Sequence, residues 1–160
     1  YLGRGAESAE SFVRAAGFTE DRLDAIAYKR RAAEQLLRTG QFVRGIGLLE
    51  AVLVEVGHPQ PKSSMGLNVA IVSGLVTAAG RGTAFVEREE PLQREDVERL
   101  DTLWAAAALM GTTDVRRGAY YTLVNAKESL DCGDPVFIAR TLALQAVHAA
   151  SRTSTRIRRW

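Results

Sequence analysis

Apolar residues recur every three or four positions through the first third of the chain, a spacing typical of helices with one buried face. It predicts a helix over residues 6–16 and a second helix that begins at Thr19 and ends at Gly40. A third helix is predicted over residues 41–56, because Gly57 closes it and two prolines after that glycine prevent its continuation. This part of the chain is therefore expected to be helical.

The pattern in the middle of the chain is less regular. Residues 66–79 have the composition of a buried helix, although β-branched residues such as Val69 and Val72 would also suit a strand. Because the flanking segments are helical and no partner strand is visible, we interpret this segment as a helix. Residues 80–94 contain glycines, a proline and an acidic run, and we expect a loop anchored by Phe85.

Helical spacing returns over residues 95–111, where a glycine ends it. Thr113 or Asp114 is expected to cap the next helix, which runs to Gly133. The Asp-Pro pair at 134–135 then predicts the cap and the first-turn proline of another helix. Both ends of the chain look cut, since there is no initiating methionine and Trp160 closes what reads as the first turn of a further helix.

Two segments repeat the same order of small and large residues. Each has a turn glycine, a small residue one turn into the following helix and a larger apolar residue a turn later: Gly40, Gly45 and Leu49 in one, and Gly3, Ser8 and Phe12 in the other, 37 residues apart. A small residue at that place lets two helix backbones approach closely. We therefore expect Gly45 at a helix crossing and Gly3–Gly5 in a turn. A third hairpin is expected around Gly133. If its alignment with the other two segments is shifted by one residue, Ala139 occupies the position of the small residue.

Helices joined by such short turns must be antiparallel, and one hairpin cannot bury its whole apolar face alone. The sequence predicts an all-α fold of stacked antiparallel helical hairpins, a fragment of an α-solenoid. Residues 1–57 are expected to form helical hairpins, and residues 58–94 a proline/glycine loop, an apolar helix and a charged loop. Residues 95–160 are expected to form a second hairpin unit with a truncated end.

The segment from Arg30 to Gly57 resembles the tetratricopeptide repeat. Positions of that family's small and large signature residues are occupied here by Ala33, Leu36, Gly40, Phe42, Gly45, Leu49, Val52 and Leu53. The chain departs from the family in having glycine in place of alanine at position 45 and in the displacement of the closing proline to Pro59. The resemblance implies degenerate repeats of this kind.

The sequence RRAAEQLLRTGQFVRGIGLLEAVLVEVG at residues 30–57 is similar to the helical arm of large bacterial serine/threonine protein kinases. In those proteins a kinase domain is followed by a predicted ATPase domain and a long helical-repeat arm. The resemblance spans about residues 4–150 and departs from the arm at 65–83, where an arginine-rich helix is usual and this chain is apolar. It implies a cytoplasmic interaction or sensing arm in signal transduction, and it carries over no kinase or ATPase residue.

Charge and composition exclude several classes of protein. Most of the net charge of +2 comes from arginines in the last nine residues, so the rest of the chain does not suggest a nucleic-acid surface. No apolar run reaches the roughly 18 residues that a membrane span needs. Cys132 is the single cysteine, which excludes an internal disulfide and favours a reducing compartment.

The chain carries no motif of a catalytic, cofactor or metal site. The glycine-rich loop and the catalytic signatures of a kinase are missing, and residues 78–85 lack both the spacing and the lysine of a phosphate-binding loop. His58 and His148 lie too far apart to form a metal motif, and Glu87, Glu89 and Glu90 read as a solvated loop. We therefore predict no catalytic, cofactor-binding or metal-ligating residue.

Candidate partner contacts lie on the first helix of each hairpin, which lines the inner surface of such stacks. We expect these first helices at 21–38 and 114–131. Residues outside their strongest apolar stripe combine aromatic and polar groups, as recognition surfaces do: Tyr28, Lys29, Gln35, Tyr121, Asn125 and Lys127. Of the adjacent residues Tyr120 and Tyr121, one must point outward.

Two functions fit these observations. The first is a protein or peptide interaction arm of a signalling kinase-ATPase, whose partner is another protein or another domain of the same chain. The alternative is the helical regulatory region of an ATPase-type transcription regulator, and a small α-helical enzyme is disfavoured because no acid and base are paired. A helix-turn-helix downstream of the segment would favour the regulator, and kinase signatures upstream would favour the arm.

Overall fold

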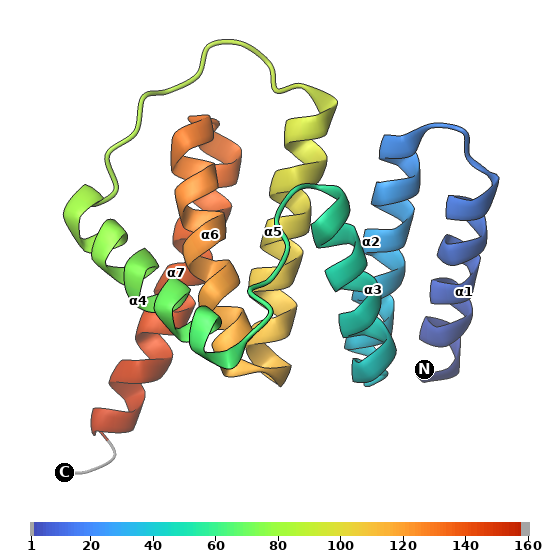
Figure 1. The fold of residues 1–160 in the computed structure, drawn as a ribbon, viewed down its shortest axis with the longest axis horizontal. Helices are drawn as coiled ribbons and strands as arrows, with labels where there is room; N and C mark the ends of the chain where they lie inside the picture. The colour runs from blue at the N-terminus through green and yellow to red at the C-terminus, as the bar shows by residue number, and fades with distance from the viewer. Residues whose placement is uncertain (1, 158–160) are drawn as a thin grey trace.

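The computed structural model describes residues 2–157, with side chains described for residues 4–147 and 150. Within that part the chain forms seven helices and no strand (Figure 1): α1 (Leu2–Phe18), α2 (Arg22–Arg38), α3 (Phe42–Glu55), α4 (Ser64–Arg81), α5 (Arg94–Thr113), α6 (Val115–Cys132) and α7 (Pro135–Ile157). The all-α prediction is confirmed, and the ambiguous segment 66–79 is helical. The further helix expected at Trp160 lies outside the described residues.

Side-chain caps set several helix starts. The Asp21 carboxylate accepts hydrogen bonds from the backbone N–H groups of Leu23 at 2.8 Å and Asp24 at 3.2 Å. Helix α2 therefore begins after Asp21, and the predicted start at Thr19 is wrong. Asp114 caps α6 in the same way, as expected.

Turn glycines end three of the helices as predicted. Gly40, Gly57 and Gly133 have φ angles of 81°, 85° and 76°, in the left-handed region that residues with a Cβ rarely adopt. Two other predicted glycine positions are wrong. Gly3 and Gly5 lie inside α1 rather than in a turn, and Gly111 lies inside α5 rather than at its end.

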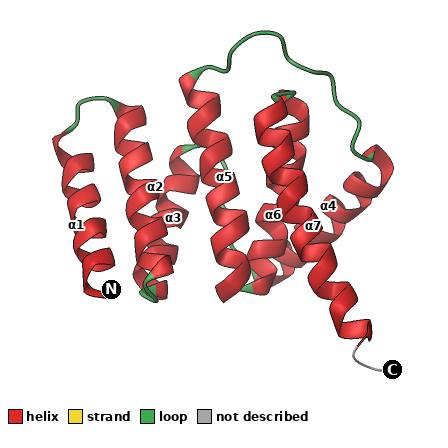
Figure 2. Cartoon of the chain, turned by 180° about the vertical axis from the view of Figure 1, so that it is seen from behind, coloured by secondary structure: helices red, strands yellow, loops and turns green. Residues whose placement is uncertain are grey.

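The helices pack as stacked hairpins in two layers. Helix α2 packs on both α1 and α3, and α5 pairs with α6, while α5 also contacts both α2 and α3. The first helices α2, α5 and α7 lie on the side seen in Figure 2, and the second helices α3 and α6 lie on the other side. Helix α6 is thus the second helix of its hairpin, and the expectation that residues 114–131 are a first helix paired with α7 is wrong.

Glycines at the helix crossings explain this pairing. A Cβ on Gly45 of α3 would lie 2.7 Å from Leu37 Cγ and 3.1 Å from the Leu37 backbone nitrogen, so the predicted crossing at Gly45 is confirmed. Gly118 of α6 occupies the equivalent place, because a Cβ there would collide with the backbone of Gly111 in α5. Ala139, which the sequence assigned to this role, is exposed, and that assignment is wrong.

The main core lies between α2, α3, α5 and α6. Fully buried side chains from these helices pack together: Ala33, Leu49, Leu53, Leu103, Ala106, Met110 and Tyr121. Helix α4 lies outside this core and crosses α6 obliquely (Figure 1). Between α4 and α5, residues 82–93 form the predicted loop, but Phe85 is 45% exposed and does not anchor it. The Arg88 backbone N–H, which donates to the Gly133 carbonyl at 3.0 Å, attaches the loop instead.

Candidate functional site

Charged side chains form a ladder across the first helices α2, α5 and α7. The ladder consists of Arg30, Glu34, Glu98, Asp101 and Arg140. Arg30 contacts Glu34 at 3.0 Å, Glu98 at 3.2 Å and Asp101 at 3.3 Å, and Arg140 contacts Asp101 at 2.7 Å. Burial alone would lower the pKa of Arg30, but the carboxylates of Asp101 and Glu98 raise it.

The ladder joins the hairpins to one another. Arg140 also lies over the ring of Trp104, with its guanidinium carbon 4.6 Å from the ring centre. Trp104 is therefore partly buried by a contact between α5 and α7 rather than lying in the main core. Since each charge in the ladder faces an opposite charge, this surface holds the stack in register and leaves no cation or anion free for a ligand.

The predicted contact residues of α2 lie beside this ladder and are partly buried. Tyr28 stacks on Phe12 of α1 with 6.4 Å between ring centres, and Lys29 pairs with Glu55 of α3 at 2.7 Å. Gln35 is also partly buried. These three residues are not brought together with Lys127, because α5 lies between α2 and α6 (Figure 1).

Two predicted contact residues of α6 face inward, so their expected exposure is wrong. Tyr121 is 0% exposed in the main core, and burial raises the pKa of its hydroxyl group. Asn125 is 1% exposed and donates from Nδ2 to Thr141 Oγ1 at 2.9 Å, which ties α6 to α7. The partly exposed member of the tyrosine pair is Tyr120.

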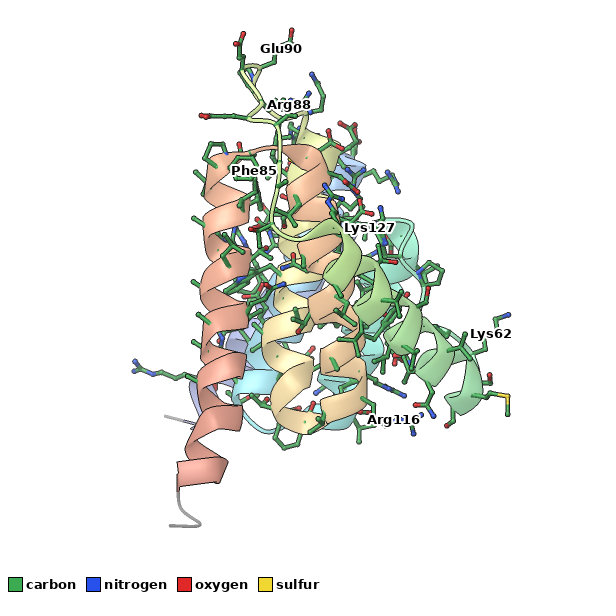
Figure 3. All side chains as sticks on the ribbon, turned by 90° about the vertical axis from the view of Figure 1, so that its left-hand side faces the viewer. Lys62, Phe85, Arg88, Glu90, Arg116 and Lys127 are labelled. Carbon is green, nitrogen blue, oxygen red and sulfur yellow. The ribbon has the colours of Figure 1, made fainter. Side chains whose placement is uncertain are left out.

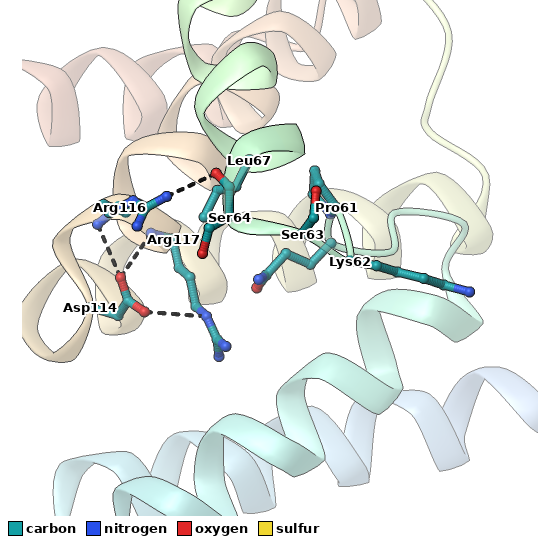
Figure 4. Close-up of a pocket in the computed structure, with 9 residues that line it drawn as sticks. Pro61, Lys62, Ser63, Ser64, Leu67, Asp114, Arg116 and Arg117 are labelled. Carbon is teal, nitrogen blue, oxygen red and sulfur yellow. Dashed lines mark hydrogen bonds and ion pairs between the residues drawn. The ribbon is translucent and has the colours of Figure 1, made fainter.

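A polar cavity of about 170 Å³ lies where the amino ends of α4 and α6 meet (Figure 4). Arg116 Nη2 crosses to α4 and donates to the Ser64 carbonyl at 2.9 Å and to Asn68 Oδ1 at 2.8 Å. Arg117 pairs with Glu50 at 2.6 Å and with Asp114 at 3.2 Å. The cavity is thus a junction between elements, lined by one carboxylate as well as by cations.

Helix α4 is apolar on all sides, and among the described helices it packs only on α6. Leu67 is its only buried residue, and Gly74 lies against Leu123 of α6. Five of its large apolar side chains are exposed: Met65 is 77% exposed, Val69 63%, Val72 60%, Leu75 52% and Val76 68%. A helix that is apolar all round is normally buried, so α4 presents a surface that calls for a partner.

A groove of about 470 Å³ runs between α4 and α7, with α6 as its floor. Small residues of α4 form one wall, namely Ala70, Ser73, Gly74, Thr77 and Ala78. The floor consists of larger residues of α6, namely Tyr120, Leu123, Val124 and Leu130, and α7 contributes Gln145. Partial burial raises the pKa of Tyr120, which is therefore a neutral hydrogen-bonding group at neutral pH.

Charged residues stand at one end of this groove. Lys127 pairs with Asp131 at 2.8 Å, and Arg81 of α4 pairs with the same carboxylate. The hydrogen bond from Lys127 lowers the pKa of Asp131, and the reciprocal bond raises the pKa of Lys127. Lys127 is exposed and is the predicted contact residue that lies in the groove (Figure 3).

None of the predicted contact residues lies on α4. A signal for this exposed surface is present in the sequence, since no charged residue occurs between Ser64 and Gly80 and apolar residues occupy every face of this helix. Such a composition by itself predicts burial inside the stack. Only the packing shows that α4 is left on the outside.

Other kinds of site find no support in the described residues. In that part of the chain no three His, Cys, Asp or Glu side chains lie close enough to hold a metal ion. None of the described helices combines the length and the apolar character needed to cross a membrane. Compared with known proteins, the chain matches no family model, no curated protein and no solved structure.

Proposed function

We propose that this chain is a protein-interaction module, the helical-repeat arm of a multidomain bacterial signalling serine/threonine kinase-ATPase. The observation that carries the module is α4, an apolar helix with one buried residue beside a groove walled by small side chains. Such a surface excludes water only when another molecule covers it. The stack of hairpins, held by the charge ladder, is the rigid frame that presents it.

The kinase-ATPase parent rests on the resemblance of residues 4–150 to the arm of those kinases. Its test is the sequence encoded on either side of this segment. Kinase signatures upstream support the proposal, whereas a helix-turn-helix downstream with no kinase upstream contradicts it and favours a transcription regulator.

The module is tested by two matched substitutions in the 160-residue chain used as bait. Thr77 and Ala51 are both small exposed helical residues, but only Thr77 lies in the groove. We expect Thr77→Arg to abolish capture of a partner and Ala51→Arg to leave it unchanged, with both variants melting like the parent. If Thr77→Arg still captures the partner and Ala51→Arg does not, the partner binds near α3, and the proposal that it binds in the groove is contradicted.

A further inference from the structure

We propose that α4 is a strap that pivots about its amino end, and that the ion pair between Arg81 of α4 and Asp131 of α6 is the latch that fixes its carboxyl end. Release of this pair lets the carboxyl half of α4 move while the stack of hairpins stays folded. Because α4 forms one wall of the groove, its position sets the shape of the groove. The inference concerns the free chain and does not rest on the proposed function.

The amino end of α4 is anchored by burial and by hydrogen bonds. Leu67, in the first turn of the helix, is 6% exposed. Arg116 of α6 donates to the Ser64 carbonyl at 2.9 Å and to Asn68 Oδ1 at 2.8 Å, so the first two turns of α4 are both attached. All of these contacts lie within residues 64–68, and this end of α4 is therefore the fixed point.

The carboxyl half of α4 lies beside open space. Small side chains between residues 70 and 78 line the groove of about 470 Å³, whose floor includes Leu123 and Leu130 of α6. No residue of α4 after Leu67 is buried. The close approach to Leu123 is made by Gly74, which has no side chain. With few partner atoms on the groove side, van der Waals contacts hold this half of the helix weakly.

Within the described residues, a single ion pair joins the carboxyl end of α4 to α6. Arg81 pairs with Asp131. Gly82 then ends the helix with a φ of 66°, and the loop that follows is held by the hydrogen bond from Arg88 to Gly133. The angle at which α4 crosses α6 (Figure 1) therefore depends on the Arg81 pair.

The latch can open readily because Asp131 has a second partner. Lys127 donates to the same carboxylate at 2.8 Å, so the departure of Arg81 leaves no unpaired charge on Asp131. The side chains of Arg81 and Asp131 are also 30% and 40% exposed, and water solvates both when they separate. Salt screens exposed pairs of this kind, so high ionic strength releases the latch.

Pulsed electron paramagnetic resonance on the spin-labelled 160-residue chain measures the movement. One pair of labels joins Ala51→Cys on α3 to Val76→Cys in the carboxyl half of α4, and a second pair joins Ala51→Cys to Met65→Cys at its amino end. All three positions are exposed, and Cys132→Ser removes the native thiol. We expect one dominant distance for each pair at low salt. About 1 M NaCl, where the Debye length is about 3 Å, should add a second distance for the Val76 pair alone.

Charge substitutions identify the latch. Arg81→Glu places a second carboxylate beside Asp131 and should raise the ratio of the second Val76 distance to the first about tenfold. Adding Asp131→Arg to this variant restores opposite charges across α4 and α6 and should return the single distance. The matched control is Lys127→Gln, which removes the other partner of Asp131 and should leave both distances as in the parent.

Four results would overturn the inference. An unchanged Val76 distance in Arg81→Glu, or no recovery on adding Asp131→Arg, would show that this pair does not fix the carboxyl end. Equal effects of Lys127→Gln and Arg81→Glu would show that the position of α4 depends on charge in general. Equal movement of the Met65 and Val76 pairs would contradict the pivot. None of these results decides whether a partner binds in the groove, which the capture experiment with Thr77→Arg tests separately.

Discussion

Glycine at the two helix crossings determines how closely the hairpin helices pack. Gly45 lies against Leu37 within the α2–α3 hairpin, and Gly118 lies against the backbone of Gly111 within the α5–α6 hairpin. Both glycines are buried. Backbone atoms of Leu37 lie beside Gly45, and backbone atoms of Gly111 lie beside Gly118. A side chain at either glycine could therefore be accommodated only if the two helices moved apart.

We expect Gly45→Leu to lower the free energy of unfolding by about 2 kcal/mol, the usual cost of overpacking a core. The matched control is Gly47→Ala in the same helix, where an added Cβ would meet nothing within 4 Å. It should stabilise the chain by about 0.5–1 kcal/mol, because alanine favours the helix. Urea denaturation of both variants measures the difference, and a neutral Gly45→Leu would show that the crossing is loosely packed.

The lowered pKa of His58 predicts that the stability of the chain depends on pH. Partial burial lowers its pKa below the usual 6.5, against the attraction of Glu128, whose carboxylate lies 4.0 Å away. Arg99 and Lys127 also face this imidazole and lower its pKa further. The unfolded chain therefore binds a proton at a higher pH than the folded chain does, and stability is lost as the pH falls below about 6.5.

The free energies of unfolding of the parent and of His58→Gln are measured by urea denaturation from pH 7.5 to pH 5. This range includes the ordinary histidine pKa of about 6.5. The parent should lose more stability than the variant over this range, since the carboxylates around position 58 are the same in both chains. Parallel curves would show that the histidine titrates as freely in the folded chain as in the unfolded one.

At the scale of single elements, α4 depends on a narrow attachment. Leu67 is its one buried side chain, and Gly74 lies against Leu123 of α6. The other attachments to α6 are polar: Arg116 donates to the Ser64 carbonyl and to Asn68, and Arg81 pairs with Asp131. The helix is capped by Ser63, whose hydroxyl oxygen accepts the Gly66 N–H at 3.0 Å, so its own start is stable. We therefore expect α4 to detach from α6 as a unit before the stack unfolds.

The test compares Leu67→Ala with Leu75→Ala, since both leucines lie in α4 but Leu75 is 52% exposed. Leu67→Ala should cost about 2 kcal/mol of local stability and should increase amide hydrogen exchange across α4 alone. Leu75→Ala should change the exchange little. Equal effects of the two substitutions would show that Leu67 is not the attachment point.

At the scale of the whole molecule, the charge ladder couples the hairpins. Arg30 is 9% exposed and contacts three carboxylates, two of them on α5. Arg30→Met keeps most of the volume but leaves these carboxylates facing one another, and we expect a loss of about 2–3 kcal/mol. The control is Arg44→Ala, which removes the exposed pair with Glu10 and should cost less than about 1 kcal/mol. A single cooperative urea transition should remain in both variants, and equal losses would reject the coupling role.

The sequence by itself determined the helices, most of the turns between them and the class of fold. These features depend on local chemistry, because caps such as Asp114, turn glycines such as Gly133 and apolar spacing act within a few residues. The Gly45 crossing was also predictable, since a small residue repeated at the same place in a hairpin has a direct steric meaning. The absence of charge along α4 was visible too.

Only the tertiary structure decided which helices pair and which faces remain open. Tyr120 and Tyr121 are adjacent on α6 and point in different directions. The sequence does not show which of the two is buried in the core, because that depends on where α3 and α5 lie. Both choices for α6, pairing with α5 or with α7, satisfy the same periodicity, and the contact of Gly118 with Gly111 selects the first. The exposure of α4 follows from the same cause: apolar composition reports what a helix can bury, and the packing of its neighbours determines how much it does bury.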